Sequence, residues 1–142
     1  MLTSARNQFR GKVIGIKTGA VNDEVAIKLP GGTELTAVIT CTSTKNLGLA
    51  PGKDVIALVM APWVILATDL NGIKLSARNQ LKGTVTGVKT GAVNTEVTVK
   101  LAGGEELAAV ITNESADTLK LAAGKPVTAI VKASHMILGV AE

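Results

Sequence analysis

The chain is 142 residues long, enough for one ordinary domain or two very small ones, and its 46% apolar and 18% charged residues exclude a disordered chain. A single cysteine, Cys41, and a single histidine, His135, exclude a disulfide framework, a His-pair or multi-thiolate metal site and most His-based catalysis. The net charge of +4 is spread evenly, with +2 in residues 1–70 and +2 in residues 71–142, which disfavours a nucleic-acid surface and fits small anions.

Five short strands and one helix are predicted in the first half of the chain. The strands cover residues 9–17, 24–29, 33–41, 53–60 and 63–68, and the helix covers residues 43–49 with a Ser or Thr as its cap. Gly11 and Gly15 flank Val13 in the first strand, which is typical of a bent barrel strand. This order of elements predicts an OB-type five-stranded barrel.

The second half of the chain repeats the first at an offset of 72 residues, without a gap. When residues 4–70 are paired with residues 76–142, 38 of the 67 positions are identical. The sequence therefore predicts an all-β protein of two tandem OB-fold five-stranded Greek-key barrels, each with one short helix. We place the first domain at residues 1–69 and the second at residues 74–142, joined through an Asn-Gly turn.

The composition also bears on assembly and location. A unit of about 70 residues buries too little surface to be stable alone, and the mean hydropathy of +0.37 is high, so we expect an obligate oligomer. The first ten residues carry charges where a signal peptide needs its apolar stretch. The longest uncharged apolar run, residues 55–68, falls short of the roughly 20 residues of a membrane span. We expect a cytoplasmic protein outside the membrane.

Two short sequences recur in both units in the same order. Ser-Ala-Arg-Asn-Gln occupies residues 4–8 and 76–80, and Lys-Thr-Gly-Ala-Val-Asn occupies residues 17–22 and 89–94. Together with a Gly-Gly turn and an Ala-Val-Ile-Thr strand end, they resemble the Mop domain, and two such units in tandem resemble a di-Mop molbindin. This resemblance covers residues 2–140. It implies a homotrimer of OB-folds that binds molybdate at subunit contacts, with tungstate as a mimic and without catalysis.

Molybdate is a dianion with four acceptor oxygens, so its site needs N–H, hydroxyl and cationic donors. Ser4 and Arg6 point the same way in an extended segment, and Thr40 lies where the third strand meets the helix. The resemblance adds the corner between the fourth and fifth strands. The candidate ligands are then Ser4, Ala5, Arg6, Thr40, Ser43 and Ala61 in the first unit and Ser76, Ala77, Arg78, Thr112, Ser115, Lys132 and Ala133 in the second.

The first unit departs from this pattern at one position, because Met60 stands where the second unit has Lys132. A missing cation removes a charge-assisted hydrogen bond of about 1.5–3 kcal/mol. We expect the site of the first unit to be weaker, unless Lys45 or Lys53 reaches into it.

A second class of oxyanion site is predicted at the Thr-Gly-Ala-Val-Asn turns. Glycine lets backbone N–H groups converge on an anion, and several copies of the turn could meet around a symmetry axis. The residues concerned are Thr18, Gly19, Ala20, Val21 and Asn22, with Thr90, Gly91, Ala92, Val93 and Asn94 as their copies.

These motifs also have plain structural explanations. The Thr-Gly-Ala-Val-Asn segment fits a hairpin turn with glycine at positive φ, and the Thr and Ser at the corner fit ordinary helix caps. Four residue types occur once in the chain, and each fits a packing role. Phe9 and Trp63 fit core or interface anchors, His135 fits a surface or interface residue, and Cys41 fits a small half-buried residue.

Three rival functions are disfavoured. A single-stranded nucleic-acid binder needs several aromatic platforms, and this chain has one Phe and one Trp. An accessory domain of a transporter ATPase or of a molybdate-responsive repressor would need a phosphate-binding loop or a helix-turn-helix on the same chain. An enzyme would need a paired acid and base, and none is apparent. The sequence favours cytoplasmic molybdate storage.

Overall fold

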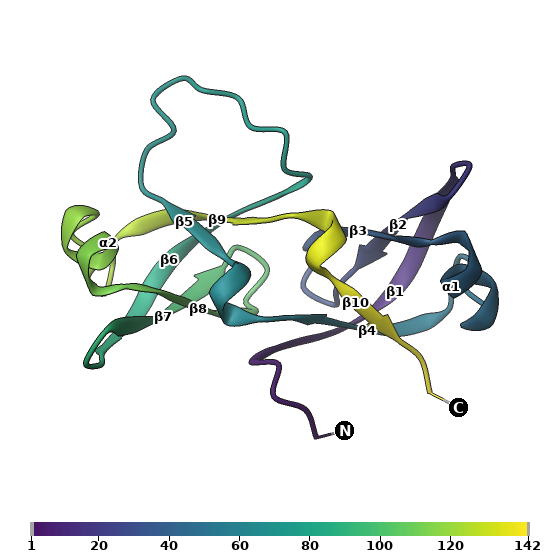
Figure 1. The fold of residues 1–142 in the computed structure, drawn as a ribbon, viewed down its shortest axis with the longest axis horizontal. Helices are drawn as coiled ribbons and strands as arrows, with labels where there is room; N and C mark the ends of the chain where they lie inside the picture. Colours follow the sequence, from purple (N-terminus) through teal and green to yellow (C-terminus); the bar gives the residue numbers. More distant parts are fainter. Residues whose placement is uncertain (1, 142) are drawn as a thin grey trace.

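Two curled five-stranded antiparallel sheets lie at opposite ends of an elongated molecule in the computed structural model, which describes residues 2–141 (Figure 1). The first repeat forms β1 (Asn7–Thr18), β2 (Asn22–Lys28), β3 (Glu34–Thr40), α1 (Cys41–Asn46), β4 (Asp54–Val59), the 3-10 turn η1 (Ala61–Trp63) and β5 (Ile65–Ala67). The second repeat forms β6 (Asn79–Thr90), β7 (Asn94–Leu101), β8 (Glu106–Thr112), α2 (Asn113–Thr118), β9 (Pro126–Val131), η2 (Ala133–His135) and β10 (Ile137–Gly139). The predicted fold class is confirmed.

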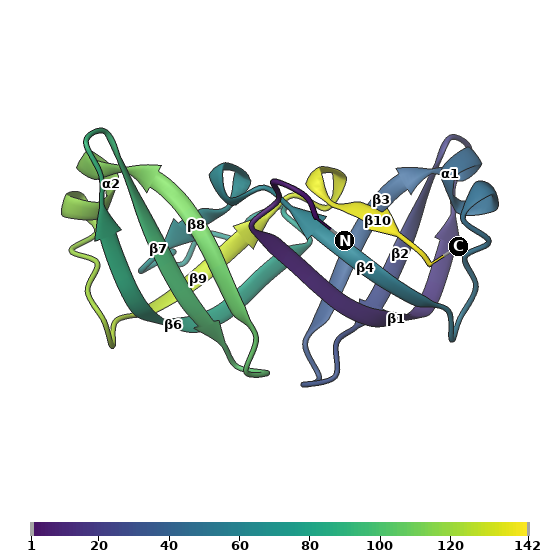
Figure 2. The same ribbon diagram turned by 90° about the horizontal axis from the view of Figure 1, so that it is seen from below.

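The two repeats exchange their last strands. One sheet has the order β10-β4-β1-β2-β3 and the other has the order β5-β9-β6-β7-β8. In register, Leu138 of β10 faces Ala57 of β4, and Leu66 of β5 faces Ala129 of β9. Each barrel therefore takes four strands from one repeat and the fifth from the other, as the crossing chains at the centre of Figure 2 show. The sequence repeat did not reveal this exchange, since the fifth strands Ile65–Ala67 and Ile137–Gly139 are nearly the same.

Several element boundaries differ from the prediction: β1 and β2 each begin two residues earlier, the helix covers residues 41–46 rather than 43–49, and β5 begins two residues later. Two of these differences have local reasons. The helix begins at Cys41 rather than at residue 43, because the side chain of Thr40 accepts a hydrogen bond from the Ser43 N–H and thereby caps it. The fifth strand begins at Ile65 rather than at Trp63, because Pro62 sits in the first turn of η1, where its fixed φ suits a helical turn.

A bend in the long first strand of each repeat lets the sheet curl. The register of β1 against β2 shifts between Val13 and Gly15, and β6 shifts between Val85 and Gly87. A Cβ on Gly11 would lie 2.7 Å from the carbonyl oxygen of Lys28, so glycine permits the close approach of β2. These bulges confirm the bent strand predicted from the glycine spacing.

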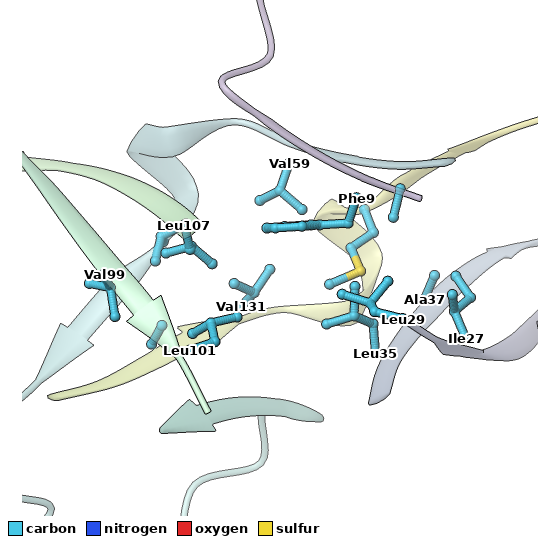
Figure 3. Packing of buried hydrophobic residues seen from close by; sticks show 14 of the residues in the cluster. Phe9, Ile27, Leu29, Leu35, Ala37, Val59, Val99, Leu101, Leu107 and Val131 are labelled. Carbon is cyan, nitrogen blue, oxygen red and sulfur yellow. The ribbon is translucent and has the colours of Figure 1, made fainter. Parts of the chain in front are cut away.

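One continuous cluster of buried aliphatic side chains fills both barrels, as Figure 3 shows in part. The alternating residues of β2 and β3 supply Ile27, Leu35 and Ala37, all of which are almost completely buried. Phe9 from β1 belongs to this cluster, which confirms its role as a core residue.

Polar side chains also join the repeats. Asn7 donates to the carbonyl oxygen of Ala108 at 2.8 Å and accepts from its N–H at 2.7 Å. Asn79 makes the same pair of bonds to Thr36, each at 2.8 Å, and donates to the carbonyl oxygen of Val131. Each asparagine is buried, and each satisfies backbone groups on the outer strand of the other repeat.

The Gly-Gly turns of the two repeats meet at the same junction. A Cβ built on Gly31 would overlap the carbonyl oxygen of Gly103, and the Thr33 hydroxyl bonds to the Glu105 carboxylate beside it. We therefore expect Gly31→Ala to lower the free energy of unfolding by about 1–3 kcal/mol, because the turns must separate. Urea unfolding checks this, with Gly15→Ala as the control because a Cβ there meets open space. Equal losses in both variants would contradict the expectation.

Within residues 2–141, no helix is long and apolar enough to cross a membrane.

Candidate functional site

A pair of hydroxyl side chains marks the end of the third strand of each repeat. The Thr40 hydroxyl donates to Ser43 Oγ at 2.8 Å and accepts from the Ser43 N–H at 3.1 Å. Thr112 and Ser115 repeat this arrangement with distances of 2.9 and 3.1 Å. The predicted caps are thus confirmed for Thr40 and Thr112, whereas Ser43 and Ser115 lie within the helices. Because each threonine gives its proton to the serine oxygen, the serine hydroxyls are the ones that could donate to an added acceptor.

Each hydroxyl pair lines a hollow that is shared between the repeats. The hollow beside Thr40 and Ser43 measures about 460 Å³ and is bordered by residues 136–138, at the start of the exchanged strand. The hollow beside Thr112 and Ser115 measures about 400 Å³ and is bordered by residue 62 and residues 64–66. The strand exchange therefore places the fifth strand of one repeat against the hydroxyl corner of the other.

The Ser-Ala-Arg segments lie beside the corner between the fourth and fifth strands. In the second repeat, Asn79 of β6 faces Val131 of β9 in the last pair of the ladder. Arg78 and Lys132 are the next residues on the two strands. In the first repeat, Asn7 faces Val59, which leaves Met60 beyond the pair instead of a cation. The register thus places Arg78 and the predicted Lys132 side by side at the end of the ladder, whereas the Thr112 corner lies on a different strand, β8.

The predicted alanines differ in exposure from their polar neighbours. Ser4 and Ser76 are exposed, whereas Ala61 and Ala133 are buried and could reach an anion only through backbone groups. The N–H of Ala5 donates to the Thr3 hydroxyl at 2.9 Å. Each segment is also held by a glutamine, since Gln8 donates to the Ala5 carbonyl and Gln80 to the Ala77 carbonyl.

The two predicted arginine ligands are paired with carboxylates across the repeats. Arg6 forms two hydrogen bonds to Glu96, one of them 3.0 Å long from Nη2 to Oε1, and Arg78 Nη1 lies 2.7 Å from Glu24 Oε2. The carboxylate raises the pKa of Arg6, and the hydrogen bonds from Arg6 hold the pKa of Glu96 below its ordinary value. Neither glutamate was identified as a site residue from the sequence. The sequence did contain a pattern that could have identified these glutamates, because Asn-x-Glu-Val recurs at residues 22–25 and 94–97.

The predicted second class of site falls on the β1–β2 and β6–β7 hairpins. The two turns lie at opposite ends of the molecule (Figure 1), so a site made of several turns would need further chains. Gly19 and Gly91 have no positive φ, which makes that part of the structural explanation wrong. Glycine is needed there because a Cβ on Gly19 would lie 2.6 Å from the carbonyl oxygen of Asn22.

A different buried pair supports each turn. In the first repeat, the Cys41 thiol donates to Asp23 Oδ1 at 3.1 Å. In the second repeat, the Thr95 hydroxyl donates to Asn113 Oδ1 at 2.6 Å, and Asn113 Nδ2 donates to the Gly91 carbonyl. The hydrogen bond to Asp23 raises the pKa of Cys41, so the half-buried thiol stays protonated near neutral pH.

Acid should weaken the first turn through Asp23. Hydrogen bonds from Cys41 and Thr44 hold the pKa of Asp23 below its ordinary value of about 3.9. The carboxylate therefore contributes stability above that value, and the contribution is lost as the pH falls through the lowered pKa. Urea unfolding between pH 7 and pH 3 should show a smaller acid loss in Asp23→Asn than in the wild type. Asp117→Asn, at an exposed helix position, is the control, and parallel losses in all three chains would contradict this assignment.

Trp63 of η1 and His135 of η2 contact each other where the two 3-10 turns approach. The rings of Trp63 and His135 are 4.8 Å apart and tilted by 36°. Trp63 keeps 45% of its surface exposed, so it is an anchor at the junction of the repeats rather than a core residue. His135 is half-buried and takes part in this contact between the repeats.

The described residues offer donors rather than metal ligands. Within residues 2–141, no group of three or more His, Cys, Asp or Glu side chains could hold a metal ion. Exposed hydroxyls, lysine and backbone N–H groups suit an anion that only accepts hydrogen bonds. Fold and site together define a tandem pair of strand-exchanged OB-like barrels.

Comparison with known proteins supports this class. The chain is 48% identical over 138 residues to the molybdenum-pterin-binding protein MopA of Rhodobacter capsulatus, covering 97% of this chain and 52% of MopA. It is 47% identical over 140 residues to the molybdenum transport protein ModE of Azotobacter vinelandii, covering 99% of this chain and 52% of ModE. The chain thus spans about half the length of these curated relatives.

A solved structure matches over the whole chain. A crystal structure of the cytoplasmic molybdate-binding protein ModG, with molybdate bound, superposes with a TM-score of 0.96 at 52% identity and covers 99% of this chain and 100% of that one. The TOBE domain model matches residues 3–66 and 75–138. The chain belongs to the TOBE domain family and carries two copies of the domain.

Proposed function

We propose that this protein binds molybdate and stores it in the cytoplasm. The observation that carries the proposal is the similarity to the molybdate-bound ModG structure over the full length of both chains. The donor chemistry agrees with it, because each repeat presents an exposed threonine and a neighbouring serine at one corner and a Ser-Ala-Arg segment at another. Tungstate, a tetrahedral dianion of the same kind, should bind in its place.

The sites are proposed to form between chains. Arg78 and Lys132 follow directly on the Asn79–Val131 pair at the end of the β6–β9 ladder, whereas Thr112 and Ser115 lie on another strand and helix of the same chain. Exposed apolar side chains such as Val21, Val93 and Ile137 provide surface for association. A homotrimer would join the basic part of one chain to the hydroxyl corner of another. Light scattering tests this assembly, and the expected molar mass is that of three chains.

Binding rather than catalysis is proposed, because the compared relatives are named for binding or transporting molybdenum or molybdate. A second candidate is the ligand-binding part of a longer protein, which is favoured by the coverage of only 52% of MopA and ModE. Both candidates require the same oxyanion site, so they differ in partners and not in its chemistry.

Calorimetric titration of the purified chain with sodium molybdate tests the proposal, repeated in excess sulfate and in phosphate. Tight binding of more than one ion per chain that survives sulfate is expected. Phosphate should bind more weakly, because its remaining proton would face a site that offers only donors. A titration without heat, on a sample without bound molybdenum, would contradict the function and leave the fold intact.

A further inference from the structure

We propose that the contact between the two repeats is selective: it joins a first repeat to a second repeat and rejects the pairing of two second repeats. Glu105 carries this selectivity. It faces a threonine in the contact within the chain, and it would face a second glutamate in a contact between like repeats. The surface therefore fits the unlike repeat as its partner and not a second copy of itself, whether or not an anion is bound.

Residues that hold the same position in the two repeats meet at the junction. At the offset of 72 residues, position 31 corresponds to 103, position 33 to 105 and position 63 to 135. All three pairs are in contact: Gly31 with Gly103, Thr33 with Glu105, and Trp63 with His135. Figure 2 shows the two barrels facing each other, with the β2–β3 and β7–β8 turns at one edge of the junction. The repeats are thus related by an approximate twofold axis, around which equal positions face each other.

The pair at positions 33 and 105 would change in a contact between like repeats. Within the chain, the Thr33 hydroxyl donates to the Glu105 carboxylate, and both side chains are half-buried. Two second repeats would set Glu105 against its own copy. Neither carboxylate could then donate a hydrogen bond, and the two like charges would repel at a place partly removed from water.

The other charges beside Glu105 do not alter this comparison. Arg10 of the first repeat and Glu106 of the second border the same small hollow as Glu105. In a contact between two second repeats, Lys82 would take the place of Arg10 and carry the same charge. The two contacts therefore differ chiefly in the residue that lies opposite Glu105.

Rejecting one kind of like pairing is enough to exclude both kinds. Every chain carries one repeat of each kind, so first repeats that paired with each other would leave an equal number of second repeats without partners. Each barrel takes its fifth strand from the repeat with which it is paired. The second repeats could then close their barrels only with each other, and every such pair would contain the two facing glutamates.

The test builds the rejected contact inside one full chain and measures thermal unfolding at a fixed chain concentration. Thr33→Glu places a glutamate opposite Glu105, as two second repeats would. We expect it to lower the unfolding midpoint by about 5–10 °C. The exchanged variant, Thr33→Glu with Glu105→Thr, again sets one threonine against one glutamate. Its midpoint should return to within about 2 °C of the wild type.

Two controls separate charge from size and place. Thr33→Gln adds the bulk of glutamate without its charge, and its amide can donate to Glu105, so it should keep most of the lost stability. Thr42→Glu makes the same substitution at an exposed position of α1, where the second repeat already has Glu114. It should shift the midpoint by less than about 2 °C.

The inference is overturned if Thr33→Glu unfolds at the same temperature as Thr42→Glu, or if Thr33→Gln loses as much stability as Thr33→Glu. An exchanged variant as unstable as Thr33→Glu also overturns it, because the pairing of unlike residues would then not matter. If Thr33→Glu does not fold at all, the exchanged variant decides alone: a folded chain with the wild-type midpoint supports the inference, and an unfolded chain overturns it.

Discussion

Lys132→Met is expected to weaken the tighter class of molybdate sites by about 10–100-fold, because a charge-assisted hydrogen bond of about 1.5–3 kcal/mol is lost. The register of β6 and β9 places Lys132 directly beyond the Asn79–Val131 pair and beside Arg78. The first repeat has Met60 at this position, half-buried and without charge. The wild-type chain should therefore contain two unlike classes of site, and this variant should make them alike.

The reverse substitution tests the same difference from the other side. Met60→Lys should strengthen the weaker class, and titration should then show a single class of tight sites. Lys100→Met, which removes an exposed lysine on β7, is the charge-matched control for the first variant. Unchanged affinity in Met60→Lys would show that Met60 does not limit the first site.

Asn79→Ala should cost about 2–4 kcal/mol of unfolding free energy, because it leaves buried backbone groups without partners. Asn79 is 2% exposed and bonds to the N–H and carbonyl of Thr36 and to the carbonyl of Val131. Asn7→Ala should have a similar effect at Ala108. Urea unfolding measures both losses.

The control for these variants is Asn46→Ala, at an exposed position at the end of α1. Surface substitutions of this kind usually change stability by less than about 0.5 kcal/mol. A loss in Asn79→Ala no larger than in the control would mean that the asparagine does not join the repeats. Molybdate titration of the folded variant would then show whether the Ser-Ala-Arg segment still needs this anchor.

The strands and turns could be predicted because their signals are local. Alternation in residues 24–29 shows which side chains face the core, and glycines around Val13 show where the first strand bends. The Asn71-Gly72 turn is present as predicted, with φ of 49° and 77°. Boundaries were displaced by up to three residues, and at the helix and the fifth strand the cause is local: the cap at Thr40 and the proline at position 62.

The strand exchange and the ion pairs could not be predicted because they are long-range. Residues 65–66 and 137–138 are both Ile-Leu, and the two fifth strands differ only at their third residue, Ala67 or Gly139, so the sequence repeat did not point to an exchange. The pairing of Arg6 with Glu96 joins residues 90 positions apart and follows only from the packing of the repeats. The kinds of side chain in the proposed site, hydroxyl groups and cations, could be named from the sequence. Which of them lie close together depended on the strand register.

The exchanged fifth strands also bear on how such a protein could arise from a shorter one. A single repeat ends with a strand that has no place in its own sheet, so its β4 edge would stay open until a second copy supplied the strand. Barrel closure in that ancestor would be bimolecular and lost on dilution. Joining two copies through residues 68–78 makes closure intramolecular, with an effective concentration set by the connection. Gene duplication would thus have made the barrels independent of how much protein the cell contains.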